Sequence, residues 1–317
     1  MMENNYDISI VIPYYKKSNI IEKILNNLDS QANISNLSTE VLVVDSHTDS
    51  DKLNLKYKKI NVSVYHTINN LSAKRNYGIN LSTGKVIACI DDDCVPSEFF
   101  LNEHFRNNIN SETKEIFSGR EVIKPLITKP KNFYKYRINN INISDMKSNK
   151  SNKGIIFRAR AMNFSFHSKY KSILPTFSEE INGYGWEDTV FFNNSLEAGF
   201  KISLCDALIE HHIEETPKSY FKKMECFGYY SYMAIVKINI LRLNNFNLNI
   251  FKILYRFVLP IFYPLTFIIY ILFYNINILI SYYLKIQSYK LHRIVYFLAI
   301  LKGSSNSHQK SSRFSYN

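Results

Sequence analysis

The stretch Lys85-Val86-Ile87-Ala88-Cys89-Ile90-Asp91-Asp92-Asp93 indicates how the chain is organised. Its first six residues form a mostly apolar run of the length of a buried strand, and three carboxylates follow without a break. Similar runs lie at residues 8–12, 41–44 and 62–66, and the first two end at Pro13 and Asp45. The sequence therefore predicts several buried strands, each ending at polar or turn-forming residues.

Helical patterns alternate with these runs. Apolar residues recur three and four apart over residues 20–28, and residues 72–81 and 188–198 are also predicted helices. Strands that alternate with helices predict an α/β fold with a mostly parallel sheet flanked by helices. Because ligands bind beyond the carboxyl ends of parallel strands, we expect Pro13, Asp45 and Asp91 to line one crevice. Residues 107–153 are polar and are expected to form loops and weak strands around an acceptor cleft.

Positive charge is concentrated in the last third of the chain. The formal net charge is +12, and residues 217–317 contain thirteen Lys and Arg but one acid, Glu225. The preceding residues carry equal numbers of basic and acidic side chains. This asymmetry predicts a catalytic domain over residues 1–216 and a basic helical tail over residues 217–317. No nucleic-acid-binding module accompanies the tail, so nucleic acid is not an expected partner.

The centre of the tail is apolar. Residues 257–284 are 28 residues without one charged side chain, which is long enough to cross a bilayer. Arg256 and Lys285 bracket this segment, and positive charge at both ends disfavours a single crossing. We expect a re-entrant hairpin or interfacial helices on an anionic membrane surface. The alternative is a helical hairpin buried against the catalytic domain or in a dimer.

Cysteine usage and the N-terminus indicate the compartment. None of the four cysteines lies in a C-x-x-C pair, and residues 1–7 lack the apolar stretch of a signal peptide. A reducing, cytoplasmic location is therefore expected. With the tail, this predicts a peripheral or integral protein at the cytoplasmic face of the membrane.

The acidic run is the first candidate for chemistry. A nucleotide-diphosphate leaving group carries concentrated negative charge, and a divalent cation can neutralise that charge as a glycosidic bond breaks. Mg²⁺ and Mn²⁺ prefer oxygen ligands, and one or two carboxylates suffice. Asp91 and Asp93 lie two residues apart at a strand end, where both can face the crevice. A solvated acidic turn is the alternative reading.

Three further groups add to this reading. In Gly183-Tyr184-Gly185-Trp186-Glu187-Asp188, an aromatic ring can stack on a sugar and a carboxylate can take the proton of an acceptor hydroxyl. Arg75, in Ser72-Ala73-Lys74-Arg75-Asn76, can steady a diphosphate near a helix start. His211-His212 offers imidazoles that can complete a metal shell. Each group also has an ordinary structural explanation: helix capping, a basic helix face, or structural histidines.

Together these residues resemble a family-two glycosyltransferase with a GT-A fold, over roughly residues 7–214. The motifs that carry the resemblance, in chain order, are Ile8-Ser9-Ile10-Val11-Ile12-Pro13 with Tyr15, Glu40-Val41-Leu42-Val43-Val44-Asp45, Ala73-Lys74-Arg75-Asn76, Asp91-Asp92-Asp93, Ala161-Met162-Asn163-Phe164-Ser165 with Phe177, Gly183 to Asp188, and His211 or His212. The resemblance implies inverting transfer of a sugar from a nucleotide-diphosphate sugar to a hydroxyl acceptor. The acceptor would be a saccharide or a lipid-linked molecule, in cell-surface polysaccharide or glycolipid assembly.

The resemblance also implies a role for each matched residue. Asp188 would be the general base, Glu187 would hold the acceptor, and Trp186 with Gly185 would line the acceptor pocket. Asp93 would be the principal ligand of Mn²⁺ or Mg²⁺, with Asp91 nearer the ribose and a histidine in the metal shell. The remaining residues would bind the donor: Pro13, Tyr15, Asp45, Arg75 and Asp92.

Two departures from the family pattern qualify the match. Ser46 and His47 replace the usual Asp and Gly after Asp45, which makes base recognition less certain. The Gln-x-x-Arg-Trp motif of processive synthases is absent, since Trp186 is the only Trp, and single transfers are expected. A non-catalytic membrane-surface binding protein on a decayed transferase fold remains an alternative. A sugar-phosphate nucleotidyltransferase is disfavoured because residues 13–17 contain no Gly-rich loop.

Overall fold

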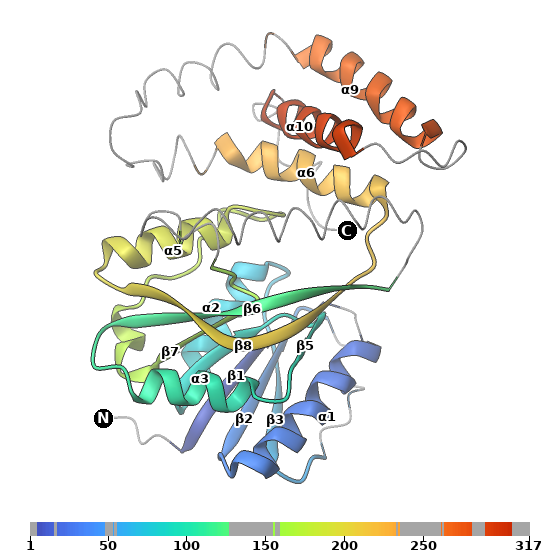
Figure 1. Cartoon of the computed structure of the whole chain (residues 1–317). Coiled ribbons are helices and arrows are strands. Elements are labelled where there is room, and N and C mark those ends of the chain that lie inside the picture. Colours follow the sequence, from blue (N-terminus) through green and yellow to red (C-terminus); the bar gives the residue numbers. More distant parts are fainter. Residues whose placement is uncertain are drawn as a thin grey trace. The chain divides into compact units, whose positions relative to one another are not determined.

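The strands form where β-branched and apolar residues follow one another, and helices lie between them. The computed structural model describes residues 5–15, 18–47, 53, 56–126, 155, 159–232, 234, 261, 263–280 and 289–305. The strands are β1 (Tyr6–Pro13), β2 (Thr39–Asp45), β3 (Ile60–His66), β4 (Gly84–Ile90), β5 (Cys94–Pro96), β6 (Glu115–Pro125), β7 (Asn163–His167) and β8 (Lys201–Ile213). The helices are α1 (Ser18–Ser35), α2 (Leu71–Leu81), α3 (Phe100–Ile109), the 3₁₀ helix η3 (Ser168–Ile173), α5 (Glu187–Glu197), α6 (Pro217–Tyr232), α9 (Tyr263–Ile278) and α10 (Tyr289–Ser305) (Figure 1).

The chain divides into two compact units. The first comprises Met1–Lys124, Ser148–Glu179 and Phe191–Ile213, and the second comprises Pro125–Lys147, Glu180–Val190 and Glu214–Asn317. The domain boundary expected at residue 216 stays a prediction. Each unit is described by itself below.

The first unit contains an eight-stranded sheet in the order β3-β2-β1-β4-β7-β6-β8-β5. Strands β3, β2, β1 and β4 are parallel, whereas β4–β7, β6–β7 and β5–β8 are antiparallel pairs. The predicted α/β fold with helices flanking a mostly parallel sheet is confirmed. Strand β8 runs from Lys201 to Ile213, and its far end pairs with β5.

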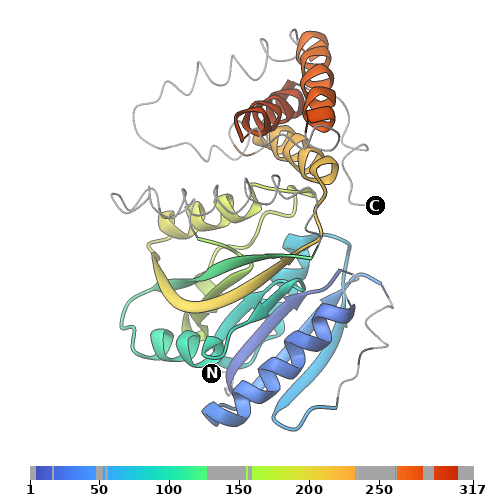
Figure 2. The ribbon, with the colours of Figure 1, turned by 45° about the vertical axis from the view of Figure 1, so that its right-hand side comes forward.

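The alternation of side chains along the central strands builds a core on each face of the sheet. Ile8, Ile10 and Ile12 of β1 belong to one buried cluster with apolar residues of α1 and α3. Val11 belongs to the opposite cluster, with Ile79 of α2 and with Phe191 and Phe192 of α5. Figure 2 shows α1 along the strands of the first face. This two-sided burial explains why the central strands read as continuous apolar runs.

Helix α2 is held close to the sheet. Its N-cap Asn70 accepts a hydrogen bond from the backbone N–H of Ala73 at 3.0 Å. Gly78 faces β1 so closely that an added Cβ would collide with Val11. This close approach brings the first turns of α2, with Lys74 and Arg75, to the carboxyl ends of β1 and β4.

The second unit contains the helices of the C-terminal third. Gly228 of α6 packs against the backbone of Ile300, and Gly303 of α10 packs against the backbone of Glu225, so the two helices touch at glycines. The expected apolar segment, residues 257–284, is described in part, as residue 261 and residues 263–280. Among the described residues, no helix combines the length and the apolar composition that a bilayer crossing needs. The helical character of the tail is seen in α6, α9 and α10.

Candidate active site

The parallel strands β1, β2 and β4 end at one edge of the sheet. Pro13 pairs in register with Val44 of β2, and Val11 pairs with Cys89 of β4. Pro13 and Asp45 are therefore the last residues of neighbouring strands, and Asp91 follows the last residue of the third. Beyond this edge the backbone N–H of Tyr14 donates to the carbonyl of Val44 at 2.8 Å.

Lys74 of α2 reaches this edge from within the protein. Its Nζ donates to the carbonyl oxygen of Tyr14 at 2.7 Å and lies 3.9 Å from Oδ1 of Asp45. The Lys74 side chain is 3% exposed and that of Asp45 is 1% exposed, so this pair is shielded from water. Burial lowers the pKa of Lys74, and the charges of Asp45 and Asp92 oppose that shift. Asp45, the expected contact of the donor base, is thus held by a buried ammonium.

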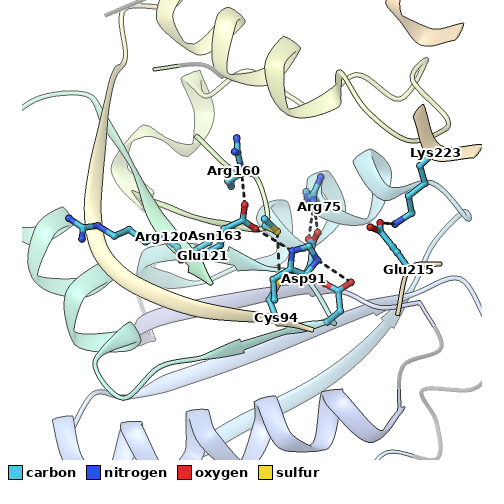
Figure 3. Close-up of polar contacts among 12 residues, drawn as sticks. Arg75, Asp91, Cys94, Arg120, Glu121, Arg160, Asn163, Glu215 and Lys223 are labelled. Atoms are coloured by element: carbon cyan, nitrogen blue, oxygen red, sulfur yellow. Dashed lines mark hydrogen bonds and ion pairs between the residues drawn. The ribbon is translucent and has the colours of Figure 1, made fainter. Parts of the chain in front are cut away.

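Arg75, the next residue, binds the first carboxylate of the acidic run. Its Nη2 lies 2.8 Å from Oδ1 and 3.1 Å from Oδ2 of Asp91 (Figure 3). The guanidinium also lies over the ring of Phe177. The Arg75 side chain is 2% exposed, whereas that of Asp91 is 23% exposed. Arg75 therefore orients the Asp91 carboxylate by two hydrogen bonds, and that carboxylate remains partly exposed to solvent.

Asp92 is directed to the loop after β1. Its Oδ2 accepts a hydrogen bond from the backbone N–H of Tyr15 at 2.6 Å, and the residue is buried. Tyr15 is half-buried, and its ring lies 5.5 Å from Nζ of Lys74. Asp92 thus fixes the position of Tyr15 at the edge where Pro13 ends its strand.

Asp93 faces a histidine and forms the candidate metal centre. Its Oδ2 lies 3.6 Å from Nε2 of His211, and Nδ1 of His211 lies 3.2 Å from Oε2 of Glu121. Burial alone would lower the pKa of His211, but the carboxylates of Asp93 and Glu121 outweigh it and raise that pKa to about 10. The imidazole thus carries positive charge between two carboxylates. A carboxylate and an imidazole that converge on one point fit Mn²⁺ or Mg²⁺, with the imidazole giving up its proton on binding.

Cys94 lies within the same cluster of possible metal-ligating atoms as Asp93 and His211. Its Sγ is 3.4 Å from Oδ1 of Asp93, and the residue is completely buried. Burial raises the pKa of this thiol well above its ordinary value, and the charge of Asp93 raises it further. Cys94 is thus the third member of the candidate cluster, while Asp93 and His211 offer the oxygen and nitrogen atoms that suit Mn²⁺ or Mg²⁺.

His212 points to a different partner. Its Nε2 lies 3.4 Å from Oε2 of Glu210, while its backbone N–H donates to the carbonyl of Asp93 at 2.8 Å. Successive side chains of a strand alternate between faces, so His211 and His212 of β8 cannot both face Asp93. The sequence left the choice open between the two histidines, and the structure brings the ring of His211 to Asp93.

The predicted acceptor residues belong to the second unit. Glu187 and Asp188 form the first turn of α5, and Gly185 and Trp186 precede it with φ of 96° and 76°. Nε1 of Trp186 donates to Oγ of Ser231 at 2.9 Å, and the indole stacks on Phe227 with ring centroids 5.1 Å apart. One face of the indole is thus covered by Phe227. The left-handed backbone at Gly185 suits a residue without Cβ.

Three residues of the site were not among those expected from the sequence. Lys74 belongs to a motif that was noticed, but its charge was not assigned a role. Glu121 and Arg160 carry no local signal, because Glu121 lies in β6, where loops and weak strands were expected, and Arg160 lies just before β7. Nε of Arg160 lies 3.4 Å from Oε1 of Glu121 (Figure 3). Only the pairing of distant strands brings Glu121 to His211 and Arg160 to Glu121.

Comparison with known proteins shows the family and the fold of the chain. Residues 9–169 match the model of Glycosyl transferase family 2. The glycosyltransferase AglE of Haloferax volcanii is 30% identical over 100 residues, which are 30% of this chain and 33% of AglE. The chain therefore matches about a third of the length of that relative.

Solved structures share the fold. The mannosyltransferase PcManGT from Pyrobaculum calidifontis, in complex with GDP-Man and Mn²⁺, superposes with a TM-score of 0.57 at 13% identity, over 98% of this chain and 90% of PcManGT. Glucosyl-3-phosphoglycerate synthase from Mycobacterium tuberculosis, in complex with Mn²⁺, UDP and glucosyl-3-phosphoglycerate, has a TM-score of 0.50 at 10% identity, over 75% and 82% of the two chains. Because the family model spans half of the sequence and the sheet has the same architecture, the chain belongs to glycosyl transferase family 2 and has the GT-A fold.

Proposed function

We propose that this chain is an inverting, metal-dependent glycosyltransferase that moves a sugar from a nucleotide-diphosphate sugar to a hydroxyl acceptor. The observation that carries the proposal is the convergence of Asp45, Arg75, Asp91 and the Asp93–His211 pair beyond one edge of the sheet. Ligands of parallel α/β sheets bind at this edge. Family membership and the fold agree with such a donor site.

The donor is held by residues that the protein has already fixed in place. Asp45 would contact the base, with the buried Lys74 keeping its carboxylate in position. Tyr15 and Asp91 would lie along the nucleoside, since Asp92 and Arg75 fix them by hydrogen bonds. Pre-organised contacts of this kind save the entropy of ordering side chains on binding. This favours a defined donor pose.

Asp93 and His211 would hold the cation. When bound, Mn²⁺ or Mg²⁺ supplies positive charge that stabilises the departing diphosphate. Two solved transferases of the same fold were crystallised with Mn²⁺ and a nucleotide, which supports manganese as the first metal to test. His211 would hold the cation as a neutral imidazole and would therefore give up a proton on binding it.

Asp188 would act on the acceptor. As the acceptor oxygen attacks the anomeric carbon, Asp188 takes the hydroxyl proton, the new C–O bond forms, and the bond to the diphosphate breaks with its electron pair leaving on the phosphate oxygen. Attack from the face opposite the leaving group inverts the anomeric centre. Glu187 would hold the acceptor, and Trp186 with Gly185 would line its pocket.

The test is a screen of nucleotide sugars for hydrolysis and transfer, with and without Mn²⁺ or Mg²⁺. Asp188→Asn should lower the transfer rate by about 10²–10⁴-fold and leave the Kd of the nucleotide diphosphate unchanged. Glu197→Gln, an exposed acid-to-amide change on the same helix, is the matched control and should have full activity. Full activity of Asp188→Asn would refute the assignment of the base.

Two alternatives give different results in the same assays. A nucleotidyltransferase would release pyrophosphate from a nucleoside triphosphate and a sugar phosphate. A non-catalytic binding protein would hydrolyse no donor, and a decayed fold would fail to bind any nucleotide diphosphate with metal by calorimetry. The retention of Asp45, Asp91, Asp93 and His211 at one edge argues against decay.

We further propose that the helical tail binds an anionic membrane surface at the cytoplasmic face, where saccharide or lipid-linked acceptors of polysaccharide or glycolipid assembly would be met. Helix α9 has no charged residue, and three of its leucine and isoleucine side chains lie on one stripe and are at least half exposed: Leu265 (52%), Ile268 (64%) and Leu272 (56%). Lys290 and Arg293 of the neighbouring α10 are also exposed. An apolar face beside basic side chains suits the interface of an anionic bilayer.

Sedimentation with vesicles tests this proposal. The full chain should pellet with vesicles that contain phosphatidylglycerol and stay in the supernatant with pure phosphatidylcholine. The double variant Ile268→Asp/Leu272→Asp should lose the binding, and Ile109→Asp, on the exposed side of α3, should keep it. A wild-type chain that does not pellet with the anionic vesicles would contradict the proposal.

A further inference from the structure

Glu121 contacts the ring of His211 on the side away from Asp93. Its Oε2 lies 3.2 Å from Nδ1 of His211, and its Oε1 lies 3.4 Å from Nε of Arg160. The other ring nitrogen of His211, Nε2, is the one 3.6 Å from Asp93. Nδ1 of the imidazole therefore faces the carboxylate of Glu121, and Nε2 faces the carboxylate of Asp93.

The sheet itself sets up this arrangement. Cys94 pairs with His211 between β5 and β8, which brings Asp93 to one side of the histidine. Strand β6, which carries Glu121, is the other neighbour of β8 in the sheet order. Three strands that are distant in sequence therefore place a carboxylate, an imidazole and a second carboxylate in a row.

Arg160 completes the row at its outer end. Its side chain pairs with Glu121, and its backbone N–H donates to Oγ of Ser118 on β6 at 2.9 Å. The Glu121 side chain is 8% exposed, so its charge needs a partner, and Arg160 supplies one besides His211. Glu121 is therefore held from two sides and cannot easily turn away from the imidazole.

A carboxylate at Nδ1 decides which nitrogen can bind a metal. Neutral imidazole carries one N–H, and a carboxylate beside Nδ1 accepts a hydrogen bond from an N–H at that nitrogen. The free lone pair is then on Nε2. The carboxylate also fixes the plane of the ring. Without this acceptor, the ring would be free to place its N–H on Nε2 or to rotate.

We propose that Glu121 is a positioning residue that holds His211 with Nε2 directed at the metal beside Asp93. The inference rests on the proposed metal site, and it adds a residue outside the direct ligands. Glu121 does not contact the donor or the metal; it acts through the imidazole. Partners of this kind typically contribute 10–100-fold to metal affinity, roughly the range expected here.

The experiment measures Mn²⁺ affinity of the full chain directly, by the electron paramagnetic resonance signal of free Mn²⁺ in a titration without donor. Glu121→Gln should weaken binding by about 10-fold, because a neutral amide oxygen is a weaker acceptor, and Glu121→Ala by up to about 100-fold. Glu210→Gln, which changes the carboxylate beside His212, is the matched control and should bind as the wild type. Circular dichroism of each metal-free variant checks that the fold is retained.

A double-mutant cycle separates positioning from general damage. If Glu121 acts through His211, adding Glu121→Gln to His211→Ala should cause no further loss of Mn²⁺ affinity. Wild-type affinity in both Glu121 variants, or fully additive losses in the cycle, would overturn the inference. If Asp93→Asn and His211→Ala themselves bind Mn²⁺ normally, the proposed metal site fails instead. The two failures are therefore distinguishable.

Discussion

His104 of α3 should make the stability of the protein fall below neutral pH, and the size of the effect follows from its surroundings. The ring is completely buried, with Nδ1 2.7 Å from Oγ of Ser165 and Nε2 2.8 Å from Oδ1 of Asn163. The amide of Asn163 donates to backbone carbonyls, so its oxygen must accept a hydrogen from Nε2. Nδ1 then accepts the hydroxyl hydrogen of Ser165. A second ring proton, at Nδ1, would break the hydrogen bond that Ser165 donates.

The magnitude comes from the pKa. Burial lowers the pKa of His104 from 6.5 to about 4, which the hydrogen bond to Asn163 only partly opposes. Between these two values the unfolded chain binds a proton that the folded chain does not, so stability is complete above pH 6.5 and falls as the pH falls towards 4. At pH 5 the loss is about 2 kcal/mol, since each pKa unit corresponds to about 1.4 kcal/mol.

The assay compares the wild type with His104→Gln, whose side chain does not titrate. The free energy of unfolding in urea is measured for both at pH 7.5 and pH 5.0. The fixed cost of the substitution cancels in the double difference, and the wild type should lose about 2 kcal/mol more than the variant. Equal losses would refute the argument. Nuclear magnetic resonance of ¹³C-labelled histidines gives a second check, because the His104 ring signal should not titrate above pH 5.

Three further predictions concern other contacts. Lys74→Met should destabilise the fold by about 3 kcal/mol and weaken nucleotide binding, because it removes the ammonium beside the buried Asp45. Urea unfolding measures the stability and calorimetry measures the nucleotide affinity. An unchanged stability would contradict this prediction. Gly303→Ala should lower the free energy of unfolding by about 1–3 kcal/mol, since the added Cβ would collide with the backbone of Glu225 where α10 crosses α6. A thermal melting temperature equal to that of the wild type would contradict this prediction. Fluorescence of Trp186, the only Trp, should change on adding acceptor and should not change on adding donor alone; the opposite result would remove it from the acceptor pocket.

The parallel half of the sheet could be predicted from the sequence because its strands are buried on both faces. The apolar runs at residues 8–12, 41–44, 62–66 and 85–90 correspond to β1, β2, β3 and β4, with ends that differ by at most two residues. The bounds of strand β6 could not be predicted, because residues 107–153 were expected only to form loops and weak strands. Glu115–Pro125 mixes charged and apolar residues without strict alternation and lies in a polar segment, and in the sheet it lies between β7 and β8.

The acidic run was predicted as a site, but the separate tasks of its residues could not be. Local sequence gives no hint that Asp91 meets Arg75, that Asp92 meets the backbone of Tyr15, or that Asp93 faces His211. Each partner comes from a different element, and the pairs form only when the sheet is complete. For the same reason the choice between His211 and His212 required the strand geometry.

In the proposed site, these three neighbouring carboxylates would link metal binding to nucleotide binding thermodynamically. Asp93 would bind the cation, and Asp91, two peptide bonds away, would face the nucleoside, so a shift of this turn on one event alters the other site. Linkage is reciprocal: whatever factor the cation adds to donor affinity, the donor must add to cation affinity. In a cell where free manganese is scarce, the supply of sugar nucleotide would then also govern how much of the protein carries its metal.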